Sequence, residues 1–478
     1  MPELLLAIDI GTSRLGAGVF SPAGELLALA SSPVRTQTPG PGRVEQDAAA
    51  VWRAVRRLIA EALDAAGRAP ADLAAVGVTA QRASAVIWDR ASGAPLAPMV
   101  VWSDLSGVDR SAQLRQAGHM VAPQMAAAKL EALIDGAPGA RAAMAAGRLA
   151  FGNVDAYIVW KLSGGAVHAT DRSQAWPTGY LDLQTLGWNA ALIDHQGLDP
   201  AIFPALVDTW GPIGRASRAA FGAEVPITAI IADQQSALIA HGDAPGVAKC
   251  TYGTSAVVNL NTGPAFVYKH PSMPPFVLSV VGGQARFCIE GMVYSAGAAF
   301  DWMRRTLGLG DRARFEALAA GVTGSAGAYV LPALHGLGAP YGDASRRALI
   351  GGLSAAVGKG HLARAAMEGL SFRVREIFDQ VYAMAELPPP EALKVDGGMT
   401  ANAVFMQIQA DLLGRPIARH AIREATACGA AICAGRGAGL LGPADAAAFV
   451  RYDRTFTPSI GADEASARLA AWKTQVYG

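Results

Sequence analysis

Residues 4–20 have the sequence LLLAIDIGTSRLGAGVF, and this stretch decides the fold prediction. Leu4 to Ile10 is a short, nearly continuous apolar run, which is typical of a strand buried on both faces. Gly11-Thr12-Ser13 then predicts a tight turn, and Leu15 to Phe20 predicts a second strand. A further turn leads into a third strand that we expect over residues 25–31.

The same pattern recurs in the second half of the chain. Residues 246–260 are GVAKCTYGTSAVVNL, in which Gly253-Thr254-Ser255 separates two apolar-rich runs. A repeat of strand, Gly-Thr-Ser turn and strand at this separation indicates two domains of related topology. We therefore expect a boundary near residue 243, with an N-terminal domain over 1–243 and a C-terminal domain over 244–478.

The composition agrees with two globular domains. The chain has 478 residues, of which 51% are apolar and 17% charged, and its formal net charge is +1. This length suits two domains of roughly 200 or more residues each, with ample apolar material for buried cores. The balanced charge does not indicate a surface for nucleic acid. We expect small molecules or a second copy of the chain as partners, and neither nucleic acid nor a membrane.

The cysteines and the N-terminal sequence predict a cytoplasmic protein. The four cysteines, Cys250, Cys288, Cys428 and Cys433, form no CxxC pair and are accompanied by no histidine cluster. A disulfide framework or a zinc site is therefore not expected, and a reducing compartment is the natural one. Asp9 interrupts the first apolar run early, which argues against a signal peptide, and no apolar stretch is long enough to span a membrane.

Two Gly-Thr-Ser turns are the first candidates for chemistry. At such a turn, backbone N–H groups and hydroxyls can point at phosphate oxygens. Asp9 stands at the end of the preceding strand, where its carboxylate can hold Mg²⁺ directly or through water. One such turn alone is more often only a turn. Two in matching positions could hold one triphosphate between two domains, so we expect ATP as the nucleotide.

Two further strand ends carry candidate residues, each with two readings. Asp233-Gln234-Gln235 follows an apolar run over 227–232, and Asp233 is placed either to accept a proton from a substrate hydroxyl or to cap a helix. Asp396-Gly397-Gly398 follows another short strand, with Asn402 downstream. Its paired glycines permit close approach of a flat ring or a phosphate, or they form an ordinary turn.

Longer motifs resemble the FGGY family of carbohydrate kinases over nearly the whole chain, closest to its glycerol kinase branch. They are ALIGGL at 348–353, HL at 361–362, AAME at 365–368, FGNVDAYIVWKL at 151–162, HATD at 168–171, TLGW at 185–188, LGAPY at 337–341 and VDGG at 395–398. The resemblance implies an α/β fold of two RNase H-like, actin-like (ASKHA) domains around an interdomain cleft. It implies substrate on the N-terminal side and nucleotide on the C-terminal side.

The resemblance also implies a role for each matching residue. Asp233 would be the catalytic base, and Asp9 would be the Mg²⁺ partner. The polyol would be surrounded by Arg82, Trp102, Asp233 and Gln234. The nucleotide would be contacted by Thr12, Ser13, Arg14, Thr254, Gly297, Gly398 and Asn402. The expected enzyme is an ATP-dependent kinase that phosphorylates a hydroxyl of a small polyol or sugar.

Two departures from the glycerol kinase pattern concern the substrate. Glycerol kinases have Gln-Arg-Glu where this chain has Gln81-Arg82-Ala83, and an aromatic Tyr where this chain has Gln124. A pocket that loses a hydroxyl-binding carboxylate also loses its preference for the substrate that used it. Glycerol itself stays possible, and the alternative is a tetritol, a pentitol or a ketopentose.

Three further expectations complete the sequence-based picture. A non-catalytic, nucleotide-dependent actin-like switch is a remote alternative, and a chaperone-type ATPase would need a peptide-binding appendage for which the chain has no room. The family resemblance implies a homo-oligomer, either a dimer or a tetramer. On a long helix expected over 361–385, we interpret Arg373, Arg375 and Glu376 as part of a solvated face.

Overall fold

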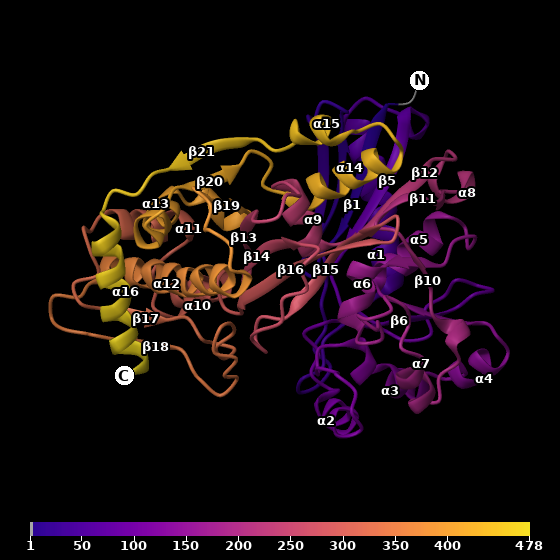
Figure 1. The fold of residues 1–478 in the computed structure, drawn as a ribbon, viewed down its shortest axis with the longest axis horizontal. Coiled ribbons are helices and arrows are strands. Elements are labelled where there is room, and N and C mark those ends of the chain that lie inside the picture. The colour runs from indigo at the N-terminus through magenta and orange to yellow at the C-terminus, as the bar shows by residue number, and fades with distance from the viewer. Residues whose placement is uncertain (1–2) are drawn as a thin grey trace. The chain divides into compact units, whose positions relative to one another are not determined.

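The computed structural model describes residues 3–478, and the chain forms two compact units (Figure 1). Both units are discontinuous in sequence. The first contains the described residues up to Ala240 together with Phe276–Arg286 and Thr426–Phe449. The second contains His241–Pro275, Phe287–Ala425 and Val450–Gly478. The predicted division of the sequence into two domains at residue 243 therefore stays a prediction.

The first unit is built on a six-stranded sheet of order β11-β12-β5-β1-β2-β3. β1, β5 and β12 are parallel neighbours, and β1, β2 and β3 form an antiparallel meander. The strands are β1 (Leu4–Ile10), β2 (Arg14–Phe20), β3 (Leu26–Pro33), β5 (Leu73–Ala80), β11 (Trp210–Arg215) and β12 (Pro226–Ala232). The apolar run of β1 is buried at every position except Asp9, as a central strand covered on both faces requires.

Helices and short strand pairs complete the first unit. The helices are α1 (Ala48–Ala65), α2 (Val108–Gln116), α3 (Leu130–Gly136), α4 (Ala140–Ala145), α5 (Val154–Leu162), α6 (Arg172–Ala175), α7 (Ala190–His195), α8 (Arg218–Phe221), α9 (Asp233–Ala240), α14 (Ala425–Gly437), whose first residue belongs to the second unit, and α15 (Pro443–Ala447). The strand pairs are β4 (Glu45–Gln46) with β7 (Met99–Val100), β6 (Val86–Asp89) with β8 (Leu149–Gly152), and β9 (Ala169–Asp171) with β10 (Ala205–Val207).

The second unit is built on a seven-stranded sheet of order β15-β16-β14-β13-β19-β20-β21, although nearly all of β15 and the first residues of β16 fall in the segment Phe276–Arg286 that is grouped with the first unit. The strands are β13 (Ala248–Tyr252), β14 (Ala256–Gly263), β15 (Pro275–Val281), β16 (Gln284–Val293), β19 (Leu393–Asp396), β20 (Ile417–His420) and β21 (Tyr452–Phe456). The other elements are α10 (Gly297–Thr306), α11 (Arg312–Ala320), α12 (Lys359–Ala385), α13 (Ala403–Leu413), α16 (Ala462–Tyr477) and the pair β17 (Tyr329–Leu331) and β18 (Leu349–Gly351).

The two sheets share one topology. In the first unit, β3-β2-β1 is an antiparallel meander followed by parallel β5 and β12. In the second, β16-β14-β13 is such a meander, followed by parallel β19 and β20. The repeat predicted from the two Gly-Thr-Ser turns is therefore confirmed, since each turn joins the first two strands of its sheet. The predicted class, two RNase H-like α/β domains, is confirmed with it.

The predicted solvated face of the long helix is wrong. Arg373 is 1% exposed and Glu376 is 5% exposed. The reason is that α12 is covered along its length by α11, α13, α16 and β17, so most of its circumference is buried. The two side chains pair with each other inside the unit. Arg375 also lies largely covered, with its guanidinium bound to the carbonyl of Leu412 at 2.9 Å.

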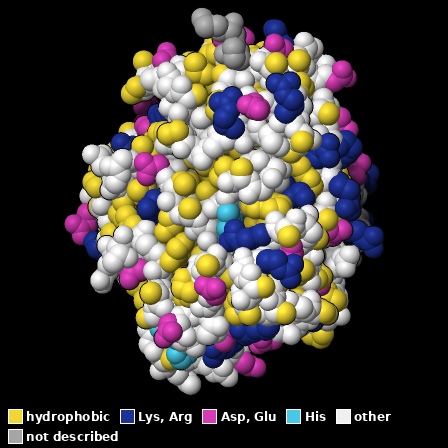
Figure 2. All heavy atoms as spheres, turned by 90° about the vertical axis from the view of Figure 1, so that its right-hand side faces the viewer, with side chains coloured by type: hydrophobic (Ala, Val, Ile, Leu, Met, Phe, Trp, Pro, Cys, Tyr) yellow, Lys and Arg dark blue, Asp and Glu magenta, His cyan; other side chains and the backbone are white. Residues whose placement is uncertain are grey.

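The surface matches the balanced charge of the sequence. On the face drawn in Figure 2, Lys and Arg side chains lie among Asp and Glu side chains. Within residues 3–478, no helix has the length and apolar character that a membrane crossing needs. All four cysteines are buried and unbonded to one another.

Candidate active site

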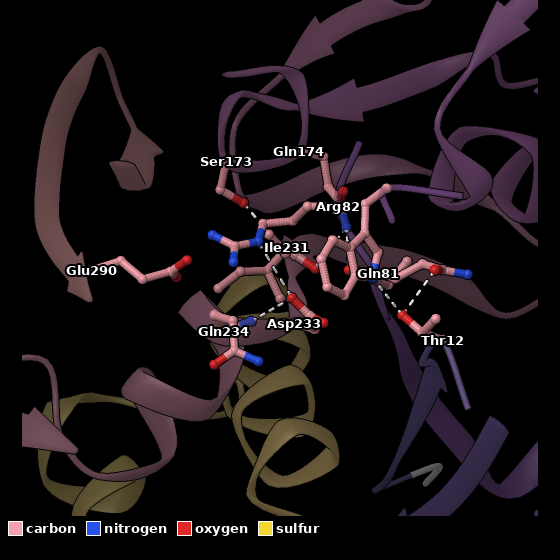
Figure 3. Close-up of polar contacts among 12 residues, drawn as sticks. Thr12, Gln81, Arg82, Ser173, Gln174, Ile231, Asp233, Gln234 and Glu290 are labelled. Carbon is pink, nitrogen blue, oxygen red and sulfur yellow. Dashed lines mark hydrogen bonds and ion pairs between the residues drawn. The ribbon is translucent and has the colours of Figure 1, made fainter. Parts of the chain in front are cut away.

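The first unit brings Asp233 and Arg82 together at the ends of two neighbouring parallel strands. Arg82 lies two residues beyond the end of β5, and Asp233 directly follows β12. Arg82 Nε lies 3.6 Å from Asp233 Oδ1, and both side chains keep partial exposure, 12% and 23% (Figure 3). Ligands of open α/β sheets bind at the carboxyl ends of the strands, which is where this pair stands.

Asp233 is also the first residue of α9. Its Oδ1 accepts a hydrogen bond of 2.7 Å from the backbone N–H of Gln234. An N-cap residue precedes the helix and accepts an N–H two or three residues further on, so this contact with the next residue is not the one that the capping interpretation predicts. The contact holds the carboxylate at the start of α9, and the side chain keeps 23% exposure.

Trp102 and Thr12, predicted for different ligands, are bonded to each other. Trp102 Nε1 donates to Thr12 Oγ1 at 2.9 Å, and Thr12 Oγ1 donates to Gln81 Oε1 at 2.9 Å. Gln46 then ties the group together, because its Nε2 donates to the Thr12 carbonyl at 2.7 Å and its Oε1 accepts from Gln81 at 3.1 Å. The Thr12 hydroxyl is thus committed within the protein, as donor to Gln81 and acceptor from Trp102.

Phe276 is a site residue that the sequence analysis missed. The Arg82 guanidinium carbon lies 4.6 Å from the centroid of the Phe276 ring, which is the geometry of a cation–π contact. Phe276 belongs to the segment 276–286, which packs with the first unit. Nothing in the local sequence could reveal this contact, because it joins residues nearly 200 positions apart.

The first Gly-Thr-Ser turn connects β1 to β2 and holds the remaining first-unit candidates. The N–H of Gly11 donates to the Arg14 carbonyl at 3.0 Å, which closes the turn. Ser13 is exposed, and the exposed guanidinium of Arg14 donates to the Ser31 hydroxyl at 2.7 Å. Asp9, in β1, is half-buried just before the turn.

Asp9 fits the demands of Mg²⁺ only as one member of a ligand set. Within residues 3–478, no group of three or more His, Cys, Asp or Glu side chains is arranged to hold a metal. Mg²⁺ in phosphoryl-transfer sites commonly takes one or two carboxylates, substrate phosphates and waters as ligands. The donor set of this chain suits that mode and does not suit a site made of protein ligands alone.

The second Gly-Thr-Ser turn lies at the start of a helix. Exposed Thr254 accepts hydrogen bonds at its carbonyl from the N–H groups of Ala296 and Ala298, at 3.0 and 3.2 Å. The N–H of Gly297, the first residue of α10, donates to the Gly253 carbonyl at 3.1 Å. A Cβ on Gly297 would lie 2.6 Å from that same oxygen, so the close approach of helix and turn requires glycine. Thr254 and Gly297 are therefore brought together.

Gly398 is the first residue of a one-turn 3₁₀ helix over Gly398–Ala401, and Asn402 directly follows it. Gly398 is exposed, and a Cβ there would meet no atom within 4 Å. Asn402 caps α13, since its Oδ1 accepts the Phe405 N–H at 2.8 Å. Gly397, directly before Gly398, has φ +92, and a Cβ there would lie 2.4 Å from the Tyr252 carbonyl oxygen. This turn of the second unit thus packs directly against β13, the strand that leads into the Gly253–Ser255 turn.

Asp396, the last residue of β19, directly precedes the Gly397-Gly398 turn and is held by buried polar side chains. Its Oδ2 accepts from His241 Nε2 at 2.9 Å and from Thr251 Oγ1 at 3.1 Å, and buried Lys249 donates to the same hydroxyl at 2.6 Å. Burial acts to raise the pKa of Asp396, but the hydrogen bond from His241, the Lys249 charge and the Thr251 hydroxyl together hold it below its ordinary value. Burial lowers the pKa of His241 to about 4. Asp396 is therefore an ionised support and has no exposed face for a ligand.

The two positions that depart from the glycerol kinase pattern lie in different settings. Ala83 is 6% exposed and has φ +55, a left-handed conformation that a residue with a Cβ rarely adopts. Such strain concentrates at functional sites. Gln124 is exposed, and its carbonyl accepts from the buried Lys129 ammonium at 3.1 Å. The structure therefore places Ala83 beside Arg82, whereas Gln124 is fixed by its backbone.

Two buried carboxylates lie in the same unit and titrate far from their ordinary range. Burial, with a smaller contribution from the charge of Asp171, raises the pKa of Asp155 to about 7, and a hydrogen bond of 2.6 Å from Thr170 and the backbone N–H groups of Asp155 and Ala156 oppose the shift. Burial raises the pKa of Asp171 to about 6, opposed by hydrogen bonds from Ser173, Gln174 and Thr209. The pKa of Asp171 is raised less than that of Asp155, and more hydrogen bonds stabilise its charged form.

Replacing Asp155 by asparagine should alter how stability depends on pH. The pKa of Asp155 is about 7 in the folded chain and 3.8 without the fold. Between these values the native state holds a proton that the unfolded state releases, so the free energy of unfolding falls as pH rises. This stabilisation is complete below the lower value and lost above pH 7. Asp155→Asn should therefore melt above wild type near pH 8 and not near pH 5.

Thermal unfolding followed across pH 5 to 8 checks this expectation. Asp109→Asn, at an exposed position in the first turn of α2, controls for the removal of one charge. A parallel pH dependence in wild type and Asp155→Asn would contradict the assignment of the titration to Asp155.

Comparison with known proteins identifies the family. The N-terminal domain of the FGGY family of carbohydrate kinases matches residues 4–240, and its C-terminal domain matches residues 248–438. A glycerol kinase of Aromatoleum aromaticum is 40% identical over 491 residues, covering 99% of this chain and 98% of that protein.

Solved structures share the fold. Plasmodium falciparum glycerol kinase with ADP superposes with a TM-score of 0.90 at 24% identity, covering 99% of this chain and 97% of that one. A xylulose kinase of Rhodospirillum rubrum superposes with a TM-score of 0.81 at 25% identity, covering 99% of both chains. Together with the two domain matches, these likenesses show that the chain belongs to the FGGY family of carbohydrate kinases and is an ATP-dependent enzyme that phosphorylates a hydroxyl group of a small polyol or sugar.

Proposed function

We propose that the enzyme transfers the γ-phosphoryl group of ATP to a terminal hydroxyl of a small polyol, with Asp233 as the catalytic base. One observation carries this proposal: a partly exposed carboxylate stands at the end of β12, 3.6 Å from the guanidinium of Arg82. Asp233 accepts the proton of the substrate hydroxyl as that oxygen attacks the γ-phosphorus in line. The hydrogen bond from the Gln234 N–H fixes the carboxylate while it does so.

The other first-unit residues orient the substrate. Arg82 and Gln234 donate hydrogen bonds to polyol oxygens, and the Trp102 ring packs against the carbon chain. Phe276 holds the Arg82 guanidinium flat, which fixes the direction of its N–H groups. Holding a hydroxyl in line with the phosphorus removes much of the entropic part of the barrier.

The nucleotide contacts come from both Gly-Thr-Ser turns. Thr12, Ser13 and Arg14 of the first turn and Thr254 of the second contact the phosphates. Gly297, Gly398 and Asn402 line the site of the adenosine. Asp9 holds Mg²⁺ directly or through water, and this ion when bound neutralises charge on the phosphate oxygens.

The substrate is best sought among polyols longer than glycerol. The curated relatives at 36% to 40% identity are glycerol kinases, so glycerol is the reference compound. Ala83 supplies no carboxylate to hydrogen-bond its hydroxyls, and the smaller side chain leaves room beside Arg82. A tetritol or pentitol fills that room and makes the contacts that glycerol loses.

A coupled ADP-release assay with MgATP tests the proposal. The panel contains glycerol, dihydroxyacetone, erythritol, xylitol, ribitol, arabitol, ribulose and xylulose. We expect the highest kcat/KM for a four- or five-carbon polyol. Strong turnover of glycerol alone would contradict the argument from Ala83, and preference for ribulose or xylulose would replace a polyol by a ketopentose. No turnover of any compound would contradict the proposed substrate class.

Restoring the carboxylate should move the preference toward glycerol. Ala83→Glu is expected to raise kcat/KM for glycerol about tenfold or more relative to that for the preferred longer polyol, because a recovered hydroxyl contact contributes of the order of 1–3 kcal/mol. Ala83→Gln has nearly the same volume without the charge and serves as the control. An equal change for both substrates would show that position 83 does not select between them.

Two further proposals concern the assembly and the compartment. We expect a dimer or tetramer, which light scattering of the purified chain would detect, whereas a monomer at all concentrations would exclude it. A cytoplasmic location agrees with four buried cysteines that form no disulfide with one another and with the need for ATP.

A further inference from the structure

Three buried side chains lie beneath the strand ends that carry Arg82 and Asp233. They are Asp171, Ser173 and Gln174, here called the strand-end clamp. Each is 0% exposed, and together they come from the end of β9 and from α6. None of them can reach a ligand, so any part that they have in the reaction must act through other residues.

The clamp holds the end of β12 through Ser173. The backbone N–H of Ala232, the last residue of β12, donates to Ser173 Oγ at 2.9 Å. That hydroxyl donates in turn to Asp171 Oδ1 at 2.8 Å, so its proton and its position are both fixed. Ala232 directly precedes Asp233, so the strand end that carries the carboxylate is tied to the clamp.

The clamp holds the end of β5 through Gln174. Gln174 Nε2 donates to the carbonyl of Ala80 at 2.8 Å and lies 3.5 Å from the carbonyl of Ile231. Ala80 is the last residue of β5 and stands two residues before Arg82. Since Ala80 and Ala232 are register partners in the parallel ladder, one amide group spans both strands where their own pairing ends.

Asp171 connects the clamp to the segment that carries Phe276. Its Oδ2 accepts from the Thr209 hydroxyl at 2.9 Å, and that hydroxyl accepts from the Val280 N–H at 3.0 Å. The Thr209 N–H donates to the Val280 carbonyl at 2.8 Å. The buried Asp171 carboxylate thus bonds to Ser173, Gln174 and Thr209. These three residues contact the segments that carry Asp233, Arg82 and Phe276.

We propose that the strand-end clamp is a positioning device for phosphoryl transfer, with Ser173 as the residue that sets the place of Asp233. The inference rests on the proposed role of Asp233 as base. A displacement of about 1 Å at a reacting group can cost on the order of 10²-fold in rate. Losing the Ser173 hydroxyl leaves the Ala232 N–H buried without an acceptor, and the strand end shifts to find one.

Ser173→Ala is the variant that tests the inference, assayed with the best substrate of the panel. We expect kcat to fall about 10- to 100-fold while KM for ATP stays within about twofold. Ser163→Ala is the matched control, because the buried Ser163 hydroxyl also accepts a backbone N–H, from Val167 at 2.9 Å, and donates to a carbonyl. It should lose comparable thermal stability and keep its kcat. Ser173→Thr, which retains the hydroxyl, should recover kcat to within about threefold of wild type.

A double-mutant cycle separates this inference from the assignment of the base. If Ser173 acts through Asp233, Ser173→Ala should lower kcat by less than about twofold in the Asp233→Asn background. A full independent loss there, or a kcat of Ser173→Ala within about twofold of wild type, would overturn the inference. High activity of Asp233→Asn itself would overturn the base instead. Gln174→Met, which removes the contact to β5 at similar length, gives the same readout if Ser173→Ala does not fold.

Discussion

Asp233→Asn should lower kcat by about 10²–10⁴-fold and leave KM for ATP nearly unchanged. A positioned general base contributes a factor of this size, and asparagine cannot accept the proton. The substitution keeps the shape of the side chain and the oxygen that accepts the Gln234 N–H at 2.7 Å. The loss therefore reports on proton acceptance, with the start of α9 preserved. Initial rates with MgATP at saturating polyol measure it.

The same variant decides between the two interpretations of Asp233. Asparagine caps helices about as well as aspartate, so a purely capping role predicts wild-type activity and unchanged melting. Asp47→Asn is the control, because the exposed Asp47 caps α1 through the Ala50 N–H at 2.9 Å and lies outside the site. Activity of Asp233→Asn within about tenfold of wild type would exclude the role of base.

The fold could be predicted from the sequence because the same short local pattern occurs twice in the chain. An apolar run, a Gly-Thr-Ser turn and a second apolar run lie within about fifteen residues each time, and the structure makes each a pair of antiparallel neighbours, β1 with β2 and β13 with β14. The strand ends were predictable for the same reason. Asp233 follows an uninterrupted apolar run, and that run is β12.

What the sequence could not show are contacts that join distant segments. Phe276 and Arg82 meet across nearly 200 residues, and the Gln174 amide reaches Ala80 across 94. The side chain of Thr12 illustrates a subtler limit. Its place in the turn predicts a phosphate contact, but its hydroxyl is committed to Trp102 and Gln81. Hydrogen-bond competition of this kind depends on which strands become neighbours.

Burial of charge was the clearest failure of sequence reasoning, and it leads to the largest expected effect on stability. Arg and Glu at helical spacing indicate a solvated face, yet the Arg373 and Glu376 side chains are each 1% exposed. Arg373 donates to the Ala339 carbonyl and to the Tyr477 hydroxyl as well. Glu376 accepts from Tyr341 and lies 3.4 Å from the Lys473 ammonium. Arg373 and Glu376 thus lie at the centre of a buried polar network in the second unit, formed with Ala339, Tyr341, Lys473 and Tyr477.

Arg373→Met should therefore destabilise the enzyme by about 3–5 kcal/mol, because it leaves the Glu376 carboxylate buried without its main partner. At about 2–4 °C for each kcal/mol in a domain of this size, the melting temperature should fall by roughly 10 °C. Arg468→Met is the control. Its partner Glu464 is exposed on α16, so the change should cost less than about 1 kcal/mol.

The double variant Arg373→Met, Glu376→Leu distinguishes a costly unpaired charge from lost packing. Removing both charges leaves no buried ion, so this variant should melt well above Arg373→Met, although the Ala339 carbonyl and two tyrosine hydroxyls lose partners. If the double variant is no more stable than Arg373→Met, the cost lies in the lost hydrogen bonds and contacts of Arg373. If the double variant recovers most of the lost stability, the Arg373–Glu376 pair contributes little net stability. Its role is then to fix the packing of α16 against α12 through Lys473 and Tyr477.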